Sequence, residues 1–213
     1  MTRLRADARR NRERILIAAR EVFVELGPDA PLDEIAARAG VGIGTLYRRF
    51  PDRQQLMRAV VHDVLVRVAE EARLALAEEP DAFRALARYM HRALDLRVSA
   101  VIPPLLGQVR LEDEEIARVR QQSTERMQAL IDRAHADGTL RPDVAFADIG
   151  LMLTRLARPL PGPFPRQLDA ELAHRHLALV LDGLRVGRDR DGPLPGPAMT
   201  LGDLRALAAG VGG

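Results

Sequence analysis

Residues 35–56, IAARAGVGIGTLYRRFPDRQQL, carry the strongest structural signal in this chain. They predict a short helix, a turn at Gly40, a second short helix and the start of a longer one. Leu46 and Phe50 stand four residues apart, so both can pack on one side of the second helix. The stretch therefore predicts a helix-turn-helix whose second helix is held by two hydrocarbon anchors.

The opposite side of this second helix is polar and basic. Burial of the two anchors turns Thr45, Arg48 and Arg49 outward together. Arginine can bridge the edge of a guanine or pair with a phosphate, so such a face suits double-stranded DNA. A solvated surface helix is the plain alternative, and we expect at least one of the two arginines to contact DNA.

The composition favours an all-α fold. Hydrophobic residues make up 47% of the 213 residues, whereas aromatic residues make up only 3%. Alanine, leucine and arginine dominate, and runs of β-branched residues are scarce, which favours helices over sheets. The formal net charge is only +2, but residues 1–20 hold seven arginines against Asp7 and Glu13. This basic arm suits a polyanionic partner, with a solvated tail as the alternative.

Several classes of function lack their signatures. The chain has no cysteine, which excludes disulfides and thiol catalysis. No zinc-protease spacing of histidines, glycine-rich phosphate loop or nucleophile elbow is present. We therefore expect no metal, no cofactor and no enzymatic activity. No stretch approaches the ~20 apolar residues of a membrane span, and the amino terminus lacks a secretion signal. We expect a cytoplasmic protein, associated with the nucleoid when bound to DNA.

Apolar residues at helical spacing predict the elements of the chain. The expected helices cover residues 15–26, 32–39, 44–50, 52–77, 81–98, 116–134 and 168–186, with another that carries Phe146 to Leu156. Asp52 and Asp143 are the expected caps of two of them. Pro103 and Pro104 are expected to interrupt the chain before a short helical piece. Residues 159–165, PLPGPFP, predict an extended loop.

These elements suggest three parts. A basic arm and helix-turn-helix head cover residues 1–51, and a long helix opens a larger helical effector-binding and dimerisation domain, 52–187. Residues 188–213 are a flexible tail in which 200–209 form at most one frayed helix. The apolar stripes of the last two body helices are candidates for burial against a second copy, giving a four-helix interface with two-fold symmetry. Closure of the monomer's own core is the alternative.

The body also offers candidates for a small-molecule effector pocket. Methionines with a few polar neighbours can line an adaptable apolar cavity, although most such positions are plain core. The candidate lining residues are Met90, His91, Leu94, Ser123, Met127, Met152 and Arg155.

The head is similar to that of TetR-family transcriptional regulators. The likeness covers residues 10–60 and rests on Arg14-Ile15-Leu16, the IA…AGV string, GTLYRRF and the following P-D-x-x-x-L. It implies an all-α homodimer that binds a two-fold operator and leaves it when a small molecule enters the body. By the same resemblance Thr45 and Tyr47 match positions that contact DNA, the tyrosine hydroxyl on a phosphate. Arg48 matches a position that reads or clamps the major groove.

Two residues depart from the family's pattern. The family often has serine or threonine at the positions of Pro31 and Gly42, where the hydroxyl caps a helix or touches phosphate. Proline does neither, while glycine leaves its N–H free but removes the capping oxygen. Arg49, Arg53 or the basic arm are expected to compensate. The expected DNA contacts are Gly42, Gly44, Thr45, Tyr47, Arg48, Arg49 and Arg53.

The sequence thus predicts a sequence-specific DNA-binding transcriptional regulator. We expect a repressor that a small-molecule effector releases from its operator. One alternative is a helical ligand-binding or adaptor protein whose head no longer binds DNA. A helical enzyme with a degenerate head is the other.

Overall fold

The structure, a computed structural model, describes residues 2–108, 114–163, 165–187 and 200–202. Within these ranges the backbone forms helices α1 to α9 and one isolated antiparallel bridge between Leu140 and Arg185. The predicted all-α class is therefore confirmed. None of the described helices is long and apolar enough to cross a membrane. Most of the predicted tail, 188–213, lies outside the described residues, and of the expected frayed helix at 200–209 only residues 200–202 are described.

Contacts between residues divide the chain into two units. The N-terminal unit contains residues 1–67 and 100–120, and the C-terminal unit contains residues 68–99 and 121–213. Helices α4 (Arg53–Glu78) and α7 (Glu114–Ala136) contribute residues to both. The division into a head of residues 1–51, a body and a tail concerns function and stays a prediction.

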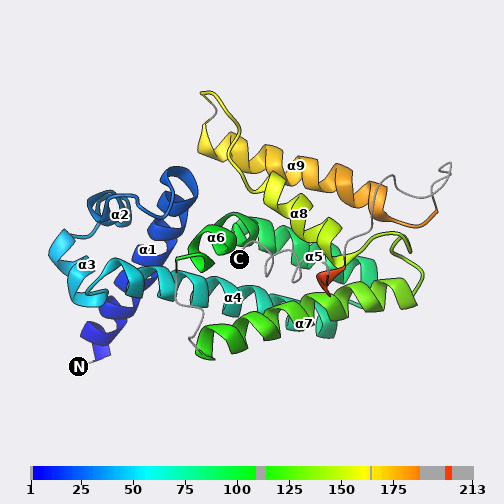
Figure 1. Cartoon of the computed structure of the whole chain (residues 1–213), viewed down its shortest axis with the longest axis horizontal. Coiled ribbons are helices and arrows are strands. Elements are labelled where there is room, and N and C mark those ends of the chain that lie inside the picture. Colours follow the sequence, from blue (N-terminus) through cyan, green and yellow to red (C-terminus); the bar gives the residue numbers. More distant parts are fainter. Residues whose placement is uncertain (1, 109–113, 164, 188–199, 203–213) are drawn as a thin grey trace, which may run out of the picture. The chain divides into compact units, whose positions relative to one another are not determined.

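Three helices open the N-terminal unit. Helix α1 (Thr2–Leu26) packs against α2 (Leu32–Ala39), and α2 contacts α3 (Ile43–Arg49) (Figure 1). Helix α1 starts well before the predicted residue 15, so the basic arm is the first part of this helix. Residues 2–14 contain neither glycine nor proline and are rich in good helix formers, but they lack the apolar periodicity that marks a buried face.

At Gly40, Asp52 and Pro31, the helix ends in this unit have the features that the local sequence predicts. Gly40 ends α2 in the left-handed conformation, with φ of 61°, and its N–H donates to backbone carbonyls of α2. Asp52 accepts a hydrogen bond from the N–H of Gln55 at 2.7 Å, which caps the start of α4 as predicted. Pro31 occupies the N-cap of α2 without any side-chain cap.

The two prolines at 103 and 104 do not interrupt the chain. Both lie inside α6 (Val98–Leu106), which corrects the prediction of a break there. Their missing N–H groups would bond only to carbonyls of the helix's first turn, and both side chains are exposed. Val101 and Leu105 on the same helix are almost completely buried, and this burial outweighs the lost hydrogen bonds.

The C-terminal unit is a set of packed helices. Helix α5 (Ala82–Asp95) contacts α8 (Phe146–Leu156) and α9 (Arg166–Leu184), and α8 contacts α9 (Figure 1). Arg126 and Arg133 of α7 donate to the α4 carbonyls of Ala69 and Leu76, each at 2.9 Å. Leu76 lies in the last turn of α4, where carbonyls lack intrahelical partners, whereas Ala69 lies farther inside the helix.

Asp143 does not cap α8, contrary to the prediction. Its carboxylate accepts two hydrogen bonds from Arg141, at 2.9 and 2.6 Å. Asp148 instead accepts from the N–H of Ala145 at 2.7 Å. The helix begins two residues later than a cap at Asp143 requires, so the third residue of the helix reaches back to the N-cap residue.

Candidate nucleic-acid interface

Helix α3 is fixed by the two predicted anchors. Leu46 and Phe50 are buried, and the N–H of Phe50 donates to the carbonyl of Leu46 at 2.8 Å. Arg48 and Arg49 are exposed, and Tyr47 keeps 48% of its surface exposed. This is the orientation that the spacing of the anchors predicts.

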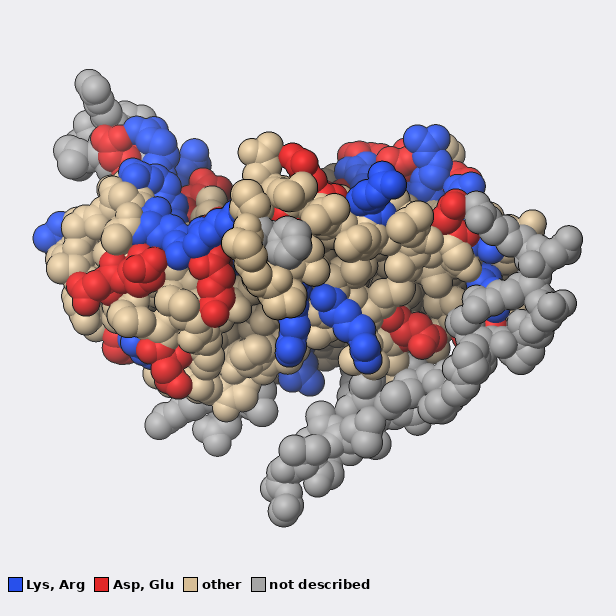
Figure 2. All heavy atoms as spheres, turned by 90° about the horizontal axis from the view of Figure 1, so that it is seen from above, with Lys and Arg blue, Asp and Glu red and all other residues tan. Residues whose placement is uncertain are grey.

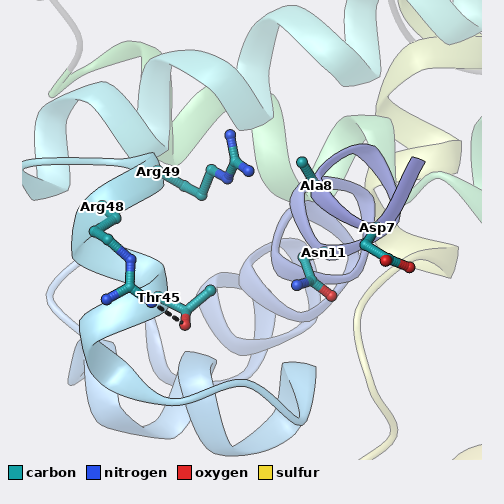
Figure 3. A pocket seen from close by; sticks show the side chains of 6 residues that line it. All are labelled: Asp7, Ala8, Asn11, Thr45, Arg48 and Arg49. Carbon is teal, nitrogen blue, oxygen red and sulfur yellow. Dashed lines mark hydrogen bonds between the residues drawn. The ribbon is translucent and has the colours of Figure 1, made fainter. Parts of the chain in front are cut away.

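Thr45, which was predicted to point outward with the two arginines, is half-buried and is bonded to the exposed Arg48. Arg48 Nη2 donates to Thr45 Oγ1 at 2.8 Å (Figure 3). The bond spans one helical turn and restrains a long side chain that would otherwise sample many rotamers. The Arg48 guanidinium is therefore already oriented on the exposed face of α3.

A hollow of about 440 Å³ lies between α3 and the first part of α1. Figure 3 shows Thr45, Arg48 and Arg49 on one side of it and three α1 side chains on the other. The α1 residues, which the sequence interpretation missed, are Asp7, Ala8 and Asn11. The signal that could have found them is the run of helix formers without glycine or proline, which places residues 7–11 on a helix rather than in an irregular arm.

The turn between α2 and α3 presents bare backbone. Gly42 is the N-cap of α3 and provides no side-chain cap. A Cβ atom added to Gly42 would meet nothing within 4 Å, and one added to Gly44 would meet only Arg48 Nη1 at 3.8 Å. A partner can thus approach the backbone closely here.

Some of the basic residues serve the head itself. Arg53 Nη1 donates to the carbonyls of Pro28 at 2.9 Å and Ala30 at 2.6 Å, which ties the start of α4 to the α1–α2 turn. Arg14 donates to the carbonyl of Gly40 at 3.1 Å, and the Arg12 guanidinium lies 5.9 Å from the centre of the Phe50 ring. A DNA contact by Arg53 stays a prediction.

On the face of the molecule in Figure 2, basic and acidic side chains are mixed, and uncharged surface separates one charged group from the next. This agrees with a formal net charge of only +2. Attraction of a polyanion therefore depends on local clusters such as the exposed arginines of α3, rather than on the charge of the whole chain.

The candidate effector residues all belong to the C-terminal unit. Met90, Leu94, Ser123 and Met127 are buried, His91 and Met152 are half-buried, and Arg155 is exposed. A pocket lined by these side chains stays a prediction. His91 Nδ1 lies 2.8 Å from Nδ1 of His174 on α9, and the two rings stack with centroids 5.1 Å apart. Burial, together with the neighbouring His174, lowers the pKa of His91.

Comparison with known proteins places these features in a family. Residues 15–60 match the family model for bacterial regulatory proteins of the tetR family, and residues 81–186 match the C-terminal domain of SbtR-like transcriptional regulators. A solved TetR transcriptional regulator from Streptomyces coelicolor is 35% identical, over 82% of this chain and 98% of that chain, with a TM-score of 0.55. The chain belongs to the TetR family.

The chain is also similar to a named repressor and to a TetR-like regulator solved with a ligand. The transcriptional repressor BepR of Brucella suis is 40% identical over 62 residues, which are 29% of this chain and 30% of BepR. LfrR from Mycobacterium smegmatis, solved in complex with proflavine, is 26% identical over 80% of this chain and 95% of its own, with a TM-score of 0.53. The chain spans less than half the length of the curated relatives it matches.

Proposed function

We propose that this TetR-family protein is a sequence-specific DNA-binding transcriptional repressor that a small molecule releases from its operator. The observation that carries the proposal is the exposed face of α3. A short helix anchored by Leu46 and Phe50 presents Tyr47, Arg48 and Arg49 outward. A rigid cationic surface of this size suits the major groove of DNA.

The roles of the contact residues follow from their chemistry. Arg48, held by Thr45, is the candidate for reading a base edge, because its guanidinium is restrained on the outward face. Tyr47 and Arg49 are the candidates for phosphate contacts. The open backbone at Gly42 and Gly44 lets the sugar–phosphate chain come close.

The repressor role and its relief by a ligand are supported by relatives. BepR is named a repressor, and LfrR was solved with proflavine bound. In the mechanism we propose, an effector in the C-terminal unit favours a conformation that cannot bind the operator. A coupling of ~1–3 kcal/mol would change operator affinity ~5–150-fold.

We place the homodimer interface on α8 and α9. Leu151, Leu168 and Leu179 of these helices are exposed although large and apolar. A two-fold pair would bring two copies of α3 to successive major grooves, ~34–36 Å apart. In the cell we expect the protein in the cytoplasm, on the nucleoid when bound to DNA.

The test is capture of genomic DNA fragments by the purified protein, followed by sequencing and titration. Arg48→Ala should lose ~1–3 kcal/mol of binding and relax the base preference at one position of each half-site. Arg84→Ala, which removes an exposed arginine of α5, is the matched control. Captured fragments without any shared sequence would contradict sequence-specific binding, and a failure to capture DNA at all would favour a ligand-binding or adaptor protein.

A further inference from the structure

We propose that Ile43 reads the 5-methyl group of a thymine in the major groove and so fixes one base of each operator half-site. The inference rests on the proposed DNA binding and adds a specificity residue that the motif alone does not assign.

Ile43 is an exposed hydrocarbon on a surface that is otherwise polar. It begins α3 and keeps 36% of its surface exposed, whereas the anchors Leu46 and Phe50 of the same segment are buried. Tyr47, four residues further on, is also exposed, so Ile43 and Tyr47 lie along the same side of the helix. The side chain of Ile43 is therefore available to a partner that covers α3.

The two glycines that flank Ile43 are not required by the fold. Gly42 has φ of −68°, which any residue adopts, and a Cβ there would meet nothing within 4 Å. Serine or threonine at this N-cap would even stabilise the helix. Gly44 lies inside α3, where glycine costs ~1 kcal/mol relative to alanine, and its added Cβ would make only an ordinary contact with Arg48.

Because internal packing does not explain these glycines, a close approach from outside does. Without side chains on either neighbour, Ile43 is the one side chain that residues 42–44 present. A surface that meets this end of α3 must therefore meet the branched sec-butyl side chain of Ile43.

The charge around Ile43 indicates which class of partner covers it. Arg48 and Arg49 are exposed on the same short helix, so the occupant is a polyanion, the duplex of the proposed operator. Its major groove offers an apolar group at each thymine, the 5-methyl group. A hydrocarbon facing the polar edge of a G·C pair would leave donors and acceptors without partners, so Ile43 favours T·A at its position.

The experiment uses uracil, which differs from thymine only by the missing methyl group. Captured operator fragments carry single thymine-to-uracil replacements and are titrated with the full-length protein. We expect about fourfold weaker binding at one thymine of each half-site, the equivalent of one methyl group buried. Ile43→Ala should bind the thymine and uracil fragments equally, while Ile17→Ala, at an α1 isoleucine with 41% exposure, keeps the difference.

The outcomes separate this inference from the proposed function. Selective binding that is insensitive to uracil at every position overturns the role of Ile43 and leaves DNA binding standing. Uracil sensitivity that survives in Ile43→Ala assigns the methyl contact to another residue and also overturns it. Absence of any selective binding by the wild-type protein overturns the proposed function itself. The uracil scan on wild-type protein needs no variant, so a misfolded variant does not affect it.

Discussion

Thr45 positions Arg48 through the hydrogen bond between their side chains, a role that the chemistry of threonine alone does not reveal. Arg48 Nη2 donates to Thr45 Oγ1 at 2.8 Å, which uses one N–H of the guanidinium and leaves the others for a partner. An arginine that is restrained before binding loses less rotamer entropy when it meets a base. Thr45 therefore acts on DNA partly through Arg48.

Thr45→Val removes the acceptor and keeps the branched shape. We expect weaker operator binding, and a double-mutant cycle with Arg48→Ala should give a coupling of ~0.5–3 kcal/mol, because both changes disable the same guanidinium. The measurement is the dissociation constant of the four proteins on one operator at fixed salt. Strictly additive losses would show that Thr45 contacts DNA independently of Arg48.

Single residues also show where sequence reasoning stops. The burial of Leu46 and Phe50 and the exposure of Arg48 and Arg49 follow from helical spacing alone, and both were predicted. The bonds of Arg53 to the carbonyls of Pro28 and Ala30 were not, since they join residues 25 and 23 positions apart. Such bonds depend on how the helices pack against one another, and local sequence patterns do not determine this packing.

Among the helices, boundaries were predictable where apolar residues repeat. Helix α2 begins and ends at the predicted residues, because its buried face and Gly40 both mark it. The first part of α1 and the proline-containing α6 were missed for opposite reasons. In α1, helix propensity acts without a buried face, and in α6, burial outweighs an unfavourable local sequence.

Gly44 lowers the stability of helix α3, whose exposed face we propose to bind DNA. Gly44→Ala should raise stability by ~0.5–1 kcal/mol and the melting temperature by about 2–4 °C per kcal/mol. The new methyl group should at the same time weaken operator binding, since it occupies the space left for the DNA. Thermal unfolding and titration of the same sample measure both effects.

Ala129→Gly is the matched control, at an exposed position inside α7. It should lower stability by a similar amount and leave operator affinity unchanged. Equal operator affinity of the wild type and Gly44→Ala would contradict the close approach of DNA to α3.

The histidine pair makes the contact between α5 and α9 sensitive to pH. Burial lowers the pKa of His91 below its ordinary value of 6.5, the charge of His174 lowers it further, and Asp95 offsets part of this. Between the lowered pKa and about 6.5 the unfolded chain binds a proton that the folded chain does not. This contribution therefore destabilises the folded protein as the pH falls through about 6.5, and it levels off below the folded-state pKa.

We expect His91→Gln to flatten the loss of stability between pH 7.5 and 5.5. Urea unfolding at several pH values, at one protein concentration, measures it. His176→Gln, which changes an exposed histidine of α9, should keep the wild-type slope. A slope unchanged in His91→Gln would mean that other groups cause the acid sensitivity.

The molecule as a whole joins its two units without an irregular linker. Helix α4 runs unbroken from Arg53 to Glu78, with residues 53–67 in the N-terminal unit and residues 68–78 in the C-terminal unit. In the mechanism that we propose, a displacement at one end of this helix reaches the other end, whereas a flexible loop would absorb it. This continuity supports an effector site in one unit that controls a DNA-binding face in the other.

We expect a dimer with two heads to bind a two-fold operator much more tightly than a single head does. If α8 and α9 form the dimer interface, Leu179→Glu places a charge where a partner helix would bury Leu179, whose exposed fraction of 64% is unusual for leucine. We expect this variant to sediment as a monomer. Because the second half-site then no longer binds as an intramolecular event, operator affinity should fall by ~10²–10⁴-fold.

Leu26→Glu provides the matched control, at a leucine with 56% exposure at the end of α1. It should remain dimeric, because it lies on neither α8 nor α9. A dimer that persists in Leu179→Glu would move the interface to another surface. A monomeric wild-type protein that still binds its operator tightly would instead mean that one head suffices, and the two-fold operator would lose its physical basis.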